Sequence, residues 1–225
     1  MKKLIIFDCD GTLTDSESMN NLAVVDALHE CGLTHYNVTF CATEFVGMTM
    51  TAVKAFVEER EGLKLPDNFQ QRFVYWAGER KKEGLNPIVG ALEAVDTLRR
   101  THDVCVASNG ERSLVFTSLQ MVGLFDVFGE EHIFTRIQVA RGKPFPELFL
   151  FAAERMGHTS EESIVIEDSV AGIQAGVAAD MHTIGITAAA HDKRHAKQAL
   201  QGAGAACVFN SWPEIVHYIN GFVDE

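Results

Sequence analysis

The sequence contains few cysteines, and no two of them are closely spaced. The 225 residues include five cysteines and no CxxC pair: Cys9, Cys31, Cys41, Cys105 and Cys207. A disulfide framework needs an even set of cysteines, and structural zinc sites use closely spaced ligand pairs. The sequence therefore indicates neither, and we interpret the cysteines as reduced and mostly buried.

Long apolar runs are also missing. The run 4–7 ends at Asp8 after four residues, which is too short for the core of a signal peptide. No segment approaches the roughly 18 apolar residues of a membrane-spanning helix, because acidic residues interrupt even the alanine-rich region 163–190. We therefore expect a cytoplasmic protein without a membrane partner.

Positive charge is scarce. Lysine and arginine number 19 against 31 aspartate and glutamate residues, which gives a formal net charge of -12. A surface of this sign repels the phosphates of nucleic acid, so we expect no nucleic acid partner. An acidic protein that binds an anionic substrate must gather positive charge locally, which makes each lysine near an acidic motif informative.

Short apolar runs that end in polar residues recur along the chain. They occupy residues 3–9, 104–107, 164–166 and 183–186, and helix-period patterns such as 91–100 and 113–121 lie between them. Strands that alternate with helices predict an α/β fold with a doubly wound parallel sheet. Ligands of such sheets bind at the carboxyl ends of the strands, so the polar residues there are the candidates for chemistry.

The segment 16–86 has a different pattern. It shows no strand-like run, and helix-period segments follow one another around Leu22, Val53 and Phe69. We predict an α/β core made of residues 1–15 and 87–225, with an inserted helical cap domain at residues 16–86. An insertion directly after the first strand can close over a substrate as a lid. For the whole chain, a monomer is the default expectation.

An acidic motif follows the first predicted strand. Asp8 and Asp10 are two residues apart, so in an extended chain their carboxylates face the same side, and Gly11 lets the backbone approach a ligand closely. Close carboxylates repel each other unless a cation or a proton lies between them, which favours an oxygen-seeking ion such as Mg²⁺. Taken alone, the motif also fits an ordinary surface turn.

Four motifs together resemble those of the haloacid dehalogenase superfamily, in particular the subgroup of β-phosphoglucomutase and small sugar phosphatases. The resemblance covers the whole chain, and its motifs appear in order: Asp8-x-Asp10-Gly11-Thr12; Ser108-Asn109; Lys143-Pro144 followed by Pro146 and Leu148-Phe149; and Glu167-Asp168-Ser169 followed by Ala171-Gly172-Ile173. The resemblance implies a Rossmann-like core with a helical cap and a phosphatase that hydrolyses a small phosphorylated metabolite. A sugar phosphate or a sugar-acid phosphate is the expected substrate.

The resemblance also implies the roles of individual residues. Asp8 would attack phosphorus to form an aspartyl-phosphate, and Asp10 would protonate the leaving oxygen and then activate water. Lys143 would hold the transferring phosphoryl group. Hydrogen bonds to its oxygens would come from two further residues, Ser108 and the backbone of Asn109.

A magnesium site belongs to the same expectation. The expected ligands are Asp8, the backbone carbonyl of Asp10, and Asp168. Glu167 is expected behind them, because adjacent residues of a strand point in opposite directions. Arg141 lies two residues before Lys143, and we favour a surface role for it over substrate binding.

Several alternatives stay open. A β-phosphoglucomutase-type mutase would have a histidine and an arginine where this chain has Asn20 and Met50. Phosphonate cleavage would need a Schiff-base lysine in the lid; Lys54 lies in that segment, but nothing in the sequence singles it out. Metal-free dehalogenation is disfavoured because Asp10 is present. A non-catalytic binding protein on the same fold is disfavoured because all four motifs are present. We place substrate selectivity in the segment 44–50.

Overall fold

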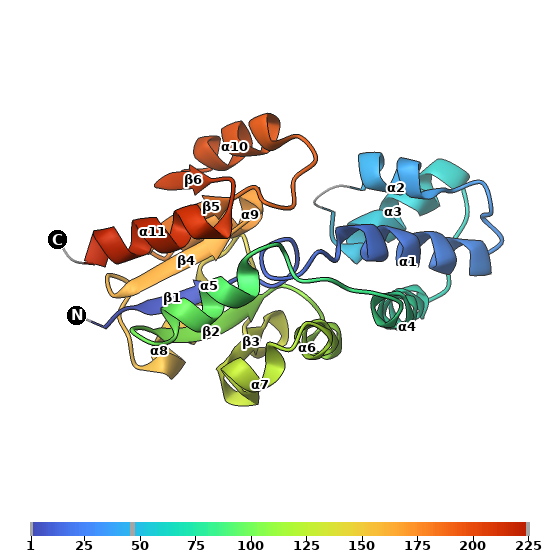
Figure 1. The fold of residues 1–225 in the computed structure, drawn as a ribbon. Coiled ribbons are helices and arrows are strands. Elements are labelled where there is room, and N and C mark those ends of the chain that lie inside the picture. Colours follow the sequence, from blue (N-terminus) through green and yellow to red (C-terminus); the bar gives the residue numbers. More distant parts are fainter. Residues whose placement is uncertain (1, 46–47, 224–225) are drawn as a thin grey trace. The chain divides into compact units, whose positions relative to one another are not determined.

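The protein divides into two compact units. The computed structural model describes residues 2–45 and 48–223. One unit comprises Met1–Asp15 with Asn86–Glu225, and the other comprises Ser16–Leu85. The first is an α/β unit and the second is helical (Figure 1).

Among the described residues of the α/β unit, six parallel strands form one sheet. Their order is β3-β2-β1-β4-β5-β6, which confirms the predicted doubly wound fold. The strand order reverses between β1 and β4, where a ligand crevice is expected. The strands are β1 (Leu4–Phe7), β2 (Asp103–Ser108), β3 (Ile133–Thr135), β4 (Ser163–Glu167), β5 (His182–Ile186) and β6 (Cys207–Phe209).

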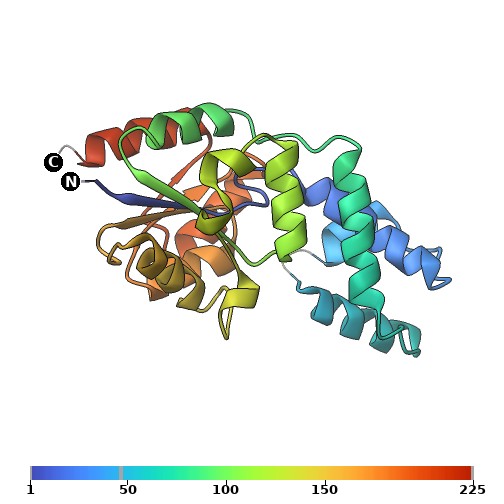
Figure 2. The same cartoon turned by 90° about the horizontal axis from the view of Figure 1, so that it is seen from below.

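Helices cover both faces of this sheet (Figure 2). Leu4 and Ile6 share one buried cluster with side chains of α8 and α9. Phe7 points to the opposite face, where its ring contacts Phe128 and Trp212. Burial on both faces explains why β1 reads as a continuous apolar run. The helical elements of this unit are α5 (Ala91–Leu98), α6 (Arg112–Met121), α7 (Phe125–Phe128), η1 (Glu130–His132), η2 (Arg136–Gln138), α8 (Glu147–Met156), α9 (Val170–Ala178), α10 (Lys193–Gly202) and α11 (Trp212–Val223).

In the second unit, residues 16–45 and 48–85 form four helices: α1 (Glu17–Glu30), α2 (Val38–Glu44), α3 (Met50–Glu61) and α4 (Phe69–Lys82). Their apolar faces meet in one core cluster that includes Leu28, Val57 and Phe69. The side chains of Asn37 and Thr49 cap the first turns of α2 and α3 by accepting backbone N–H hydrogen bonds. The two longest helices of this unit, α1 and α4, have 14 residues each. Within residues 2–45 and 48–223, no helix is long and apolar enough to span a membrane.

Two leucines on α8 test where the core lies. Leu148 is fully buried against the sheet, whereas Leu150 on the same helix is 42% exposed. We expect Leu148→Ala to lower the free energy of unfolding by about 2–5 kcal/mol, because it removes buried apolar contacts and leaves a cavity. Leu150→Ala should change it by less than about 0.5 kcal/mol. Chemical denaturation followed by circular dichroism measures both, and equal losses would contradict this packing.

Candidate active site

The polar ends of three neighbouring strands meet at one edge of the sheet. Phe7 pairs with Val106 of β2 and with Ile166 of β4, so these strands end side by side. Asp8 follows β1, and its backbone N–H donates to the Ile166 carbonyl at 3.0 Å. Ser108 ends β2 and Glu167 ends β4. The parallel register thus brings the predicted motifs together at the switch point of the sheet.

Lys143 joins two of these motifs. Its Nζ lies 2.6 Å from Asp8 Oδ1 and 2.6 Å from Glu167 Oε1, and its side chain is only 3% exposed. Burial acts to lower the pKa of Lys143, but the two carboxylates outweigh it and raise that pKa above its usual value. The buried group is therefore a permanent ammonium ion at physiological pH.

Glu167 uses both of its carboxylate oxygens inside the protein. Oε1 pairs with Lys143, and Oε2 accepts hydrogen bonds from the backbone N–H and the hydroxyl of Ser169, each at 2.9 Å. A Cβ on Gly172 would lie 1.8 Å from the Glu167 carboxyl carbon, so only glycine leaves room for this arrangement. Glu167 is thus fixed as a partner of Lys143.

Asp168 lies against the loop that follows Asp8. The Thr12 hydroxyl donates to Asp168 Oδ1 at 3.3 Å. Gly11 has a φ of +83°, and a Cβ there would lie 2.1 Å from Asp168 Oδ2. Glycine is therefore required at position 11 for its backbone conformation and for the space that it leaves to the carboxylate.

Three carboxylates lie close together at this edge of the sheet. Asp8, Glu167 and Asp168 each offer an oxygen, and these three oxygens lie within 4.8 Å of one another. Burial raises the pKa of Asp8 to about 7 against the lowering effect of Lys143, and burial raises the pKa of Asp168 well above its usual value. Lys143 forms ion pairs with two of these three carboxylates, Asp8 and Glu167. A set of oxygen donors with this charge fits a hard divalent cation such as Mg²⁺.

Asn109 ties the end of β2 to the loop that carries Lys143. Its side-chain amide donates to the Lys143 carbonyl at 2.9 Å, and its Oδ1 accepts from the Lys143 N–H at 2.9 Å. The side chain is therefore a structural link, while its backbone N–H is the candidate donor. Ser108 is buried, and its Oγ accepts from the Gly110 N–H at 3.1 Å. Asp10 is half-buried near them, with Oδ2 3.4 Å from the position of a Cβ on Gly110.

Other residues considered from the sequence are engaged elsewhere. Arg141 pairs with Glu147 and lies 4.1 Å from the centroid of the Phe145 ring, with its side chain 57% exposed. Lys54 donates to the Pro66 carbonyl at 3.3 Å. Val46 and Gly47 of the segment 44–50 lie outside the described residues.

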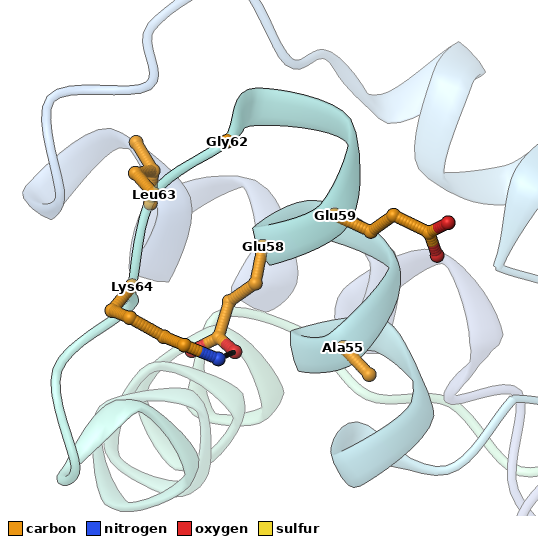
Figure 3. A pocket seen from close by; sticks show the side chains of 6 residues that line it. All are labelled: Ala55, Glu58, Glu59, Gly62, Leu63 and Lys64. Carbon is orange, nitrogen blue, oxygen red and sulfur yellow. Dashed lines mark hydrogen bonds and ion pairs between the residues drawn. The ribbon is translucent and has the colours of Figure 1, made fainter.

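A cavity lies in the helical unit. It has a volume of about 470 Å³ and is lined by Ala55, Glu58, Glu59, Gly62, Leu63 and Lys64 (Figure 3). Its size suits a small metabolite. Its charge does not suit a phosphorylated one, because Lys64 Nζ pairs with Glu58 at 2.8 Å and Glu59 adds a negative charge. The edge of the sheet is therefore the better candidate for phosphate chemistry.

The sequence of this chain is similar to those of known proteins. The haloacid dehalogenase-like hydrolase family matches residues 2–180, and the chain belongs to that family. Protein SUPPRESSOR OF QUENCHING 1 of Arabidopsis thaliana is 33% identical over 195 residues, which cover 81% of this chain and 17% of that longer protein. The 6-phosphogluconate phosphatase of Escherichia coli K12 is 30% identical over 191 residues, with 84% of each chain covered.

A solved structure agrees with these relatives. A haloacid dehalogenase family hydrolase from Deinococcus radiodurans R1, with bound phosphate and sodium, has a TM-score of 0.75 and 32% identity. The match covers 95% of this chain and 93% of that one. The predicted family and the predicted enzyme class, a phosphoric monoester hydrolase, are thus confirmed.

Three features that shape the site were not predicted from the sequence: the side-chain link of Asn109, the Thr12 hydroxyl and the space left by Gly172. All three residues stand inside the quoted motifs, but the contacts of Asn109 and Thr12 join residues 34 and 156 positions apart, and the space at Gly172 depends on how closely its backbone approaches the Glu167 carboxylate.

The space at Gly172 gives a direct test. We expect Gly172→Ala to lower the stability of the protein by about 1–3 kcal/mol, because the new methyl group overlaps the buried Glu167 carboxylate. Gly202→Ala, at the end of α10 with no atom within 4 Å of the new Cβ, is the matched control and should be neutral or slightly stabilising. Thermal unfolding of both variants and of the wild type measures the change in stability. A Gly172→Ala protein as stable as its control would show that Glu167 is not confined as described.

Proposed function

We propose that the protein is a Mg²⁺-dependent phosphatase that hydrolyses a small phosphorylated metabolite through an aspartyl-phosphate on Asp8. The observation that carries this proposal is the buried Lys143 ammonium, 2.6 Å from the Asp8 carboxylate within a cluster of three acidic groups. Such a site pairs a nucleophile with a fixed positive charge for a phosphoryl group.

The first half-reaction transfers the phosphoryl group to Asp8. An oxygen of Asp8 forms a bond to phosphorus while the bond from phosphorus to the substrate oxygen breaks, and the leaving oxygen takes a proton from Asp10. Lys143 stabilises the ionised form of Asp8 against burial and then offsets the charge on the phosphoryl oxygens. Glu167 keeps the ammonium in place during this step.

The second half-reaction releases phosphate. Asp10, now ionised, takes a proton from water as the water attacks phosphorus, and the bond from phosphorus to Asp8 breaks. The Ser108 hydroxyl and the backbone N–H of Asn109 donate to the phosphoryl oxygens throughout. When Mg²⁺ is bound, Asp8, Asp168 and the Asp10 carbonyl would hold it, and it would supply positive charge beside the phosphoryl group.

A sugar phosphate or a sugar-acid phosphate is the proposed substrate class. It is supported by the relative that acts as a 6-phosphogluconate phosphatase, which matches over 84% of both chains. We further propose that residues 16–86 act as a cap domain whose segment 44–50 selects the substrate. Asn20 and Met50 supply neither a proton-transfer group nor a second phosphate site, which favours transfer to water over transfer to a sugar. We propose a monomeric, cytoplasmic enzyme with no nucleic acid partner.

The nucleophile is tested by removing its charge. Asp8→Asn should reduce turnover by at least about 10³-fold while the protein stays folded, because an amide of the same size is a poor nucleophile. Asp126→Asn, the same change at an exposed position on α7, is the control and should keep full activity. Phosphate release and circular dichroism are the measurements. An Asp8→Asn variant with near-normal turnover would exclude the covalent mechanism.

The metal and the substrate class are tested together. A panel of sugar phosphates and sugar-acid phosphates, including 6-phosphogluconate, should release phosphate with Mg²⁺ and should lose that activity in EDTA. β-Glucose 1-phosphate belongs in the panel because a mutase would convert it to glucose 6-phosphate. That product in place of free phosphate would contradict the hydrolase assignment, and undiminished turnover in EDTA would contradict the metal.

A further inference from the structure

A tryptophan from the last helix reaches the loop that carries the acidic motif. Trp212 is the first residue of α11 and is fully buried. Its indole Nε1 donates a hydrogen bond to the Thr12 carbonyl at 3.3 Å, across a sequence separation of 200 residues. Its ring also lies against Phe7, with centroids 5.7 Å apart, and Phe7 directly precedes Asp8. Trp212 therefore contacts both ends of the short segment between Phe7 and Thr12.

Thr12 links Trp212 to the carboxylate of Asp168. Its carbonyl accepts from Trp212, and its hydroxyl donates to Asp168 Oδ1 at 3.3 Å. Thr12 itself is fully buried, and among the residues that the structure describes its carbonyl has no backbone hydrogen-bond partner. A buried carbonyl without a donor is unfavourable. The N–H of the same peptide unit, on Leu13, donates to the Cys9 carbonyl at 2.9 Å, so this bond and the indole N–H together hold the peptide unit in one orientation. That orientation is the one in which the Thr12 hydroxyl reaches Asp168.

Trp212 packs closely against its neighbours. Gly90 precedes α5 with a φ of +86°, and a Cβ there would lie 3.2 Å from the Trp212 Cβ. Phenylalanine would supply the same contact with Phe7 but no N–H group, and a buried indole N–H normally has a partner. The contact with Phe7 therefore needs no N–H group at position 212, whereas the hydrogen bond to Thr12 does.

We propose that Trp212 is a positioning residue for the metal ligand Asp168, and that it acts through Thr12. This inference rests on the proposed function, because it takes Asp168 to be a ligand of Mg²⁺. Outer groups that orient a metal ligand typically change metal affinity 10- to 100-fold when they are removed. Trp212 acts through one intermediate residue, so the low end of that range, about tenfold, is expected.

The experiment measures Mg²⁺ binding without turnover. Trp212→Phe keeps the aromatic ring and removes the N–H donor, and calorimetric titration of the folded protein should give a Mg²⁺ dissociation constant about tenfold above wild type. Saturating Mg²⁺ should restore kcat to within about twofold of wild type, with the KM for the phosphorylated substrate unchanged. Trp76→Phe is the matched control, because it makes the same change at a tryptophan of α4 that packs against Tyr75 and has no part in the contact with Thr12. It should bind Mg²⁺ as wild type does.

A second variant tests the route through Thr12. Thr12→Val removes the hydroxyl and should weaken Mg²⁺ binding to a similar degree, whereas Thr12→Ser should retain most of the affinity. The Trp212→Phe/Thr12→Val double variant should be no weaker than the weaker single variant, since both changes interrupt the same route.

The outcomes separate this inference from the proposed function. A Trp212→Phe protein that binds Mg²⁺ within twofold of wild type, whatever its stability, overturns the positioning role alone. Multiplicative effects in the double variant overturn the route through Thr12 in the same way. A wild-type protein that binds no Mg²⁺ overturns the metal site of the proposed function, and the role of Trp212 with it.

Discussion

The buried ammonium of Lys143 is the constraint on which the site depends. Burial of Asp8 and Glu167 without a cation would leave two carboxylates close together in a region of low dielectric constant. Lys143 lies 2.6 Å from each and joins the ends of β1 and β4 to a loop distant in sequence. The same ammonium keeps Asp8 closer to its ionised form, which a nucleophile requires. Structural stability and the proposed chemistry thus depend on one ion triad.

The residues around this triad hold its side chains in position and do not themselves react. Ser169 holds Glu167 through two hydrogen bonds, and Asn109 holds the backbone of Lys143 through two more. Gly11 and Gly172 leave the space that Asp168 and Glu167 occupy. A preorganised site of this kind does not need to rearrange as charge develops on a substrate. It explains why the four motifs contain small and polar residues besides the acidic ones.

Much of the fold could be predicted from the sequence, because β1, β2, β4 and β5 are apolar runs that end in polar residues. The strands β3 and β6 could not, since three residues each carry no pattern. In the site, the structure brings together Asp8, Lys143, Glu167 and Asp168, whose residue types matched known motifs. The contact of Trp212 with Thr12 could not be predicted, because nothing local to α11 indicates a partner 200 residues earlier.

A crystal structure with Mg²⁺ and beryllium trifluoride, which mimics a phosphoryl group on a carboxylate, tests the central claim most directly. We expect beryllium trifluoride bound through beryllium to the Asp8 carboxylate, with the Lys143 ammonium within hydrogen-bond distance of its fluorine atoms. We expect the metal ion between Asp8 and Asp168. An unmodified Asp8, or a metal ion bound away from Asp168, would contradict the central claim.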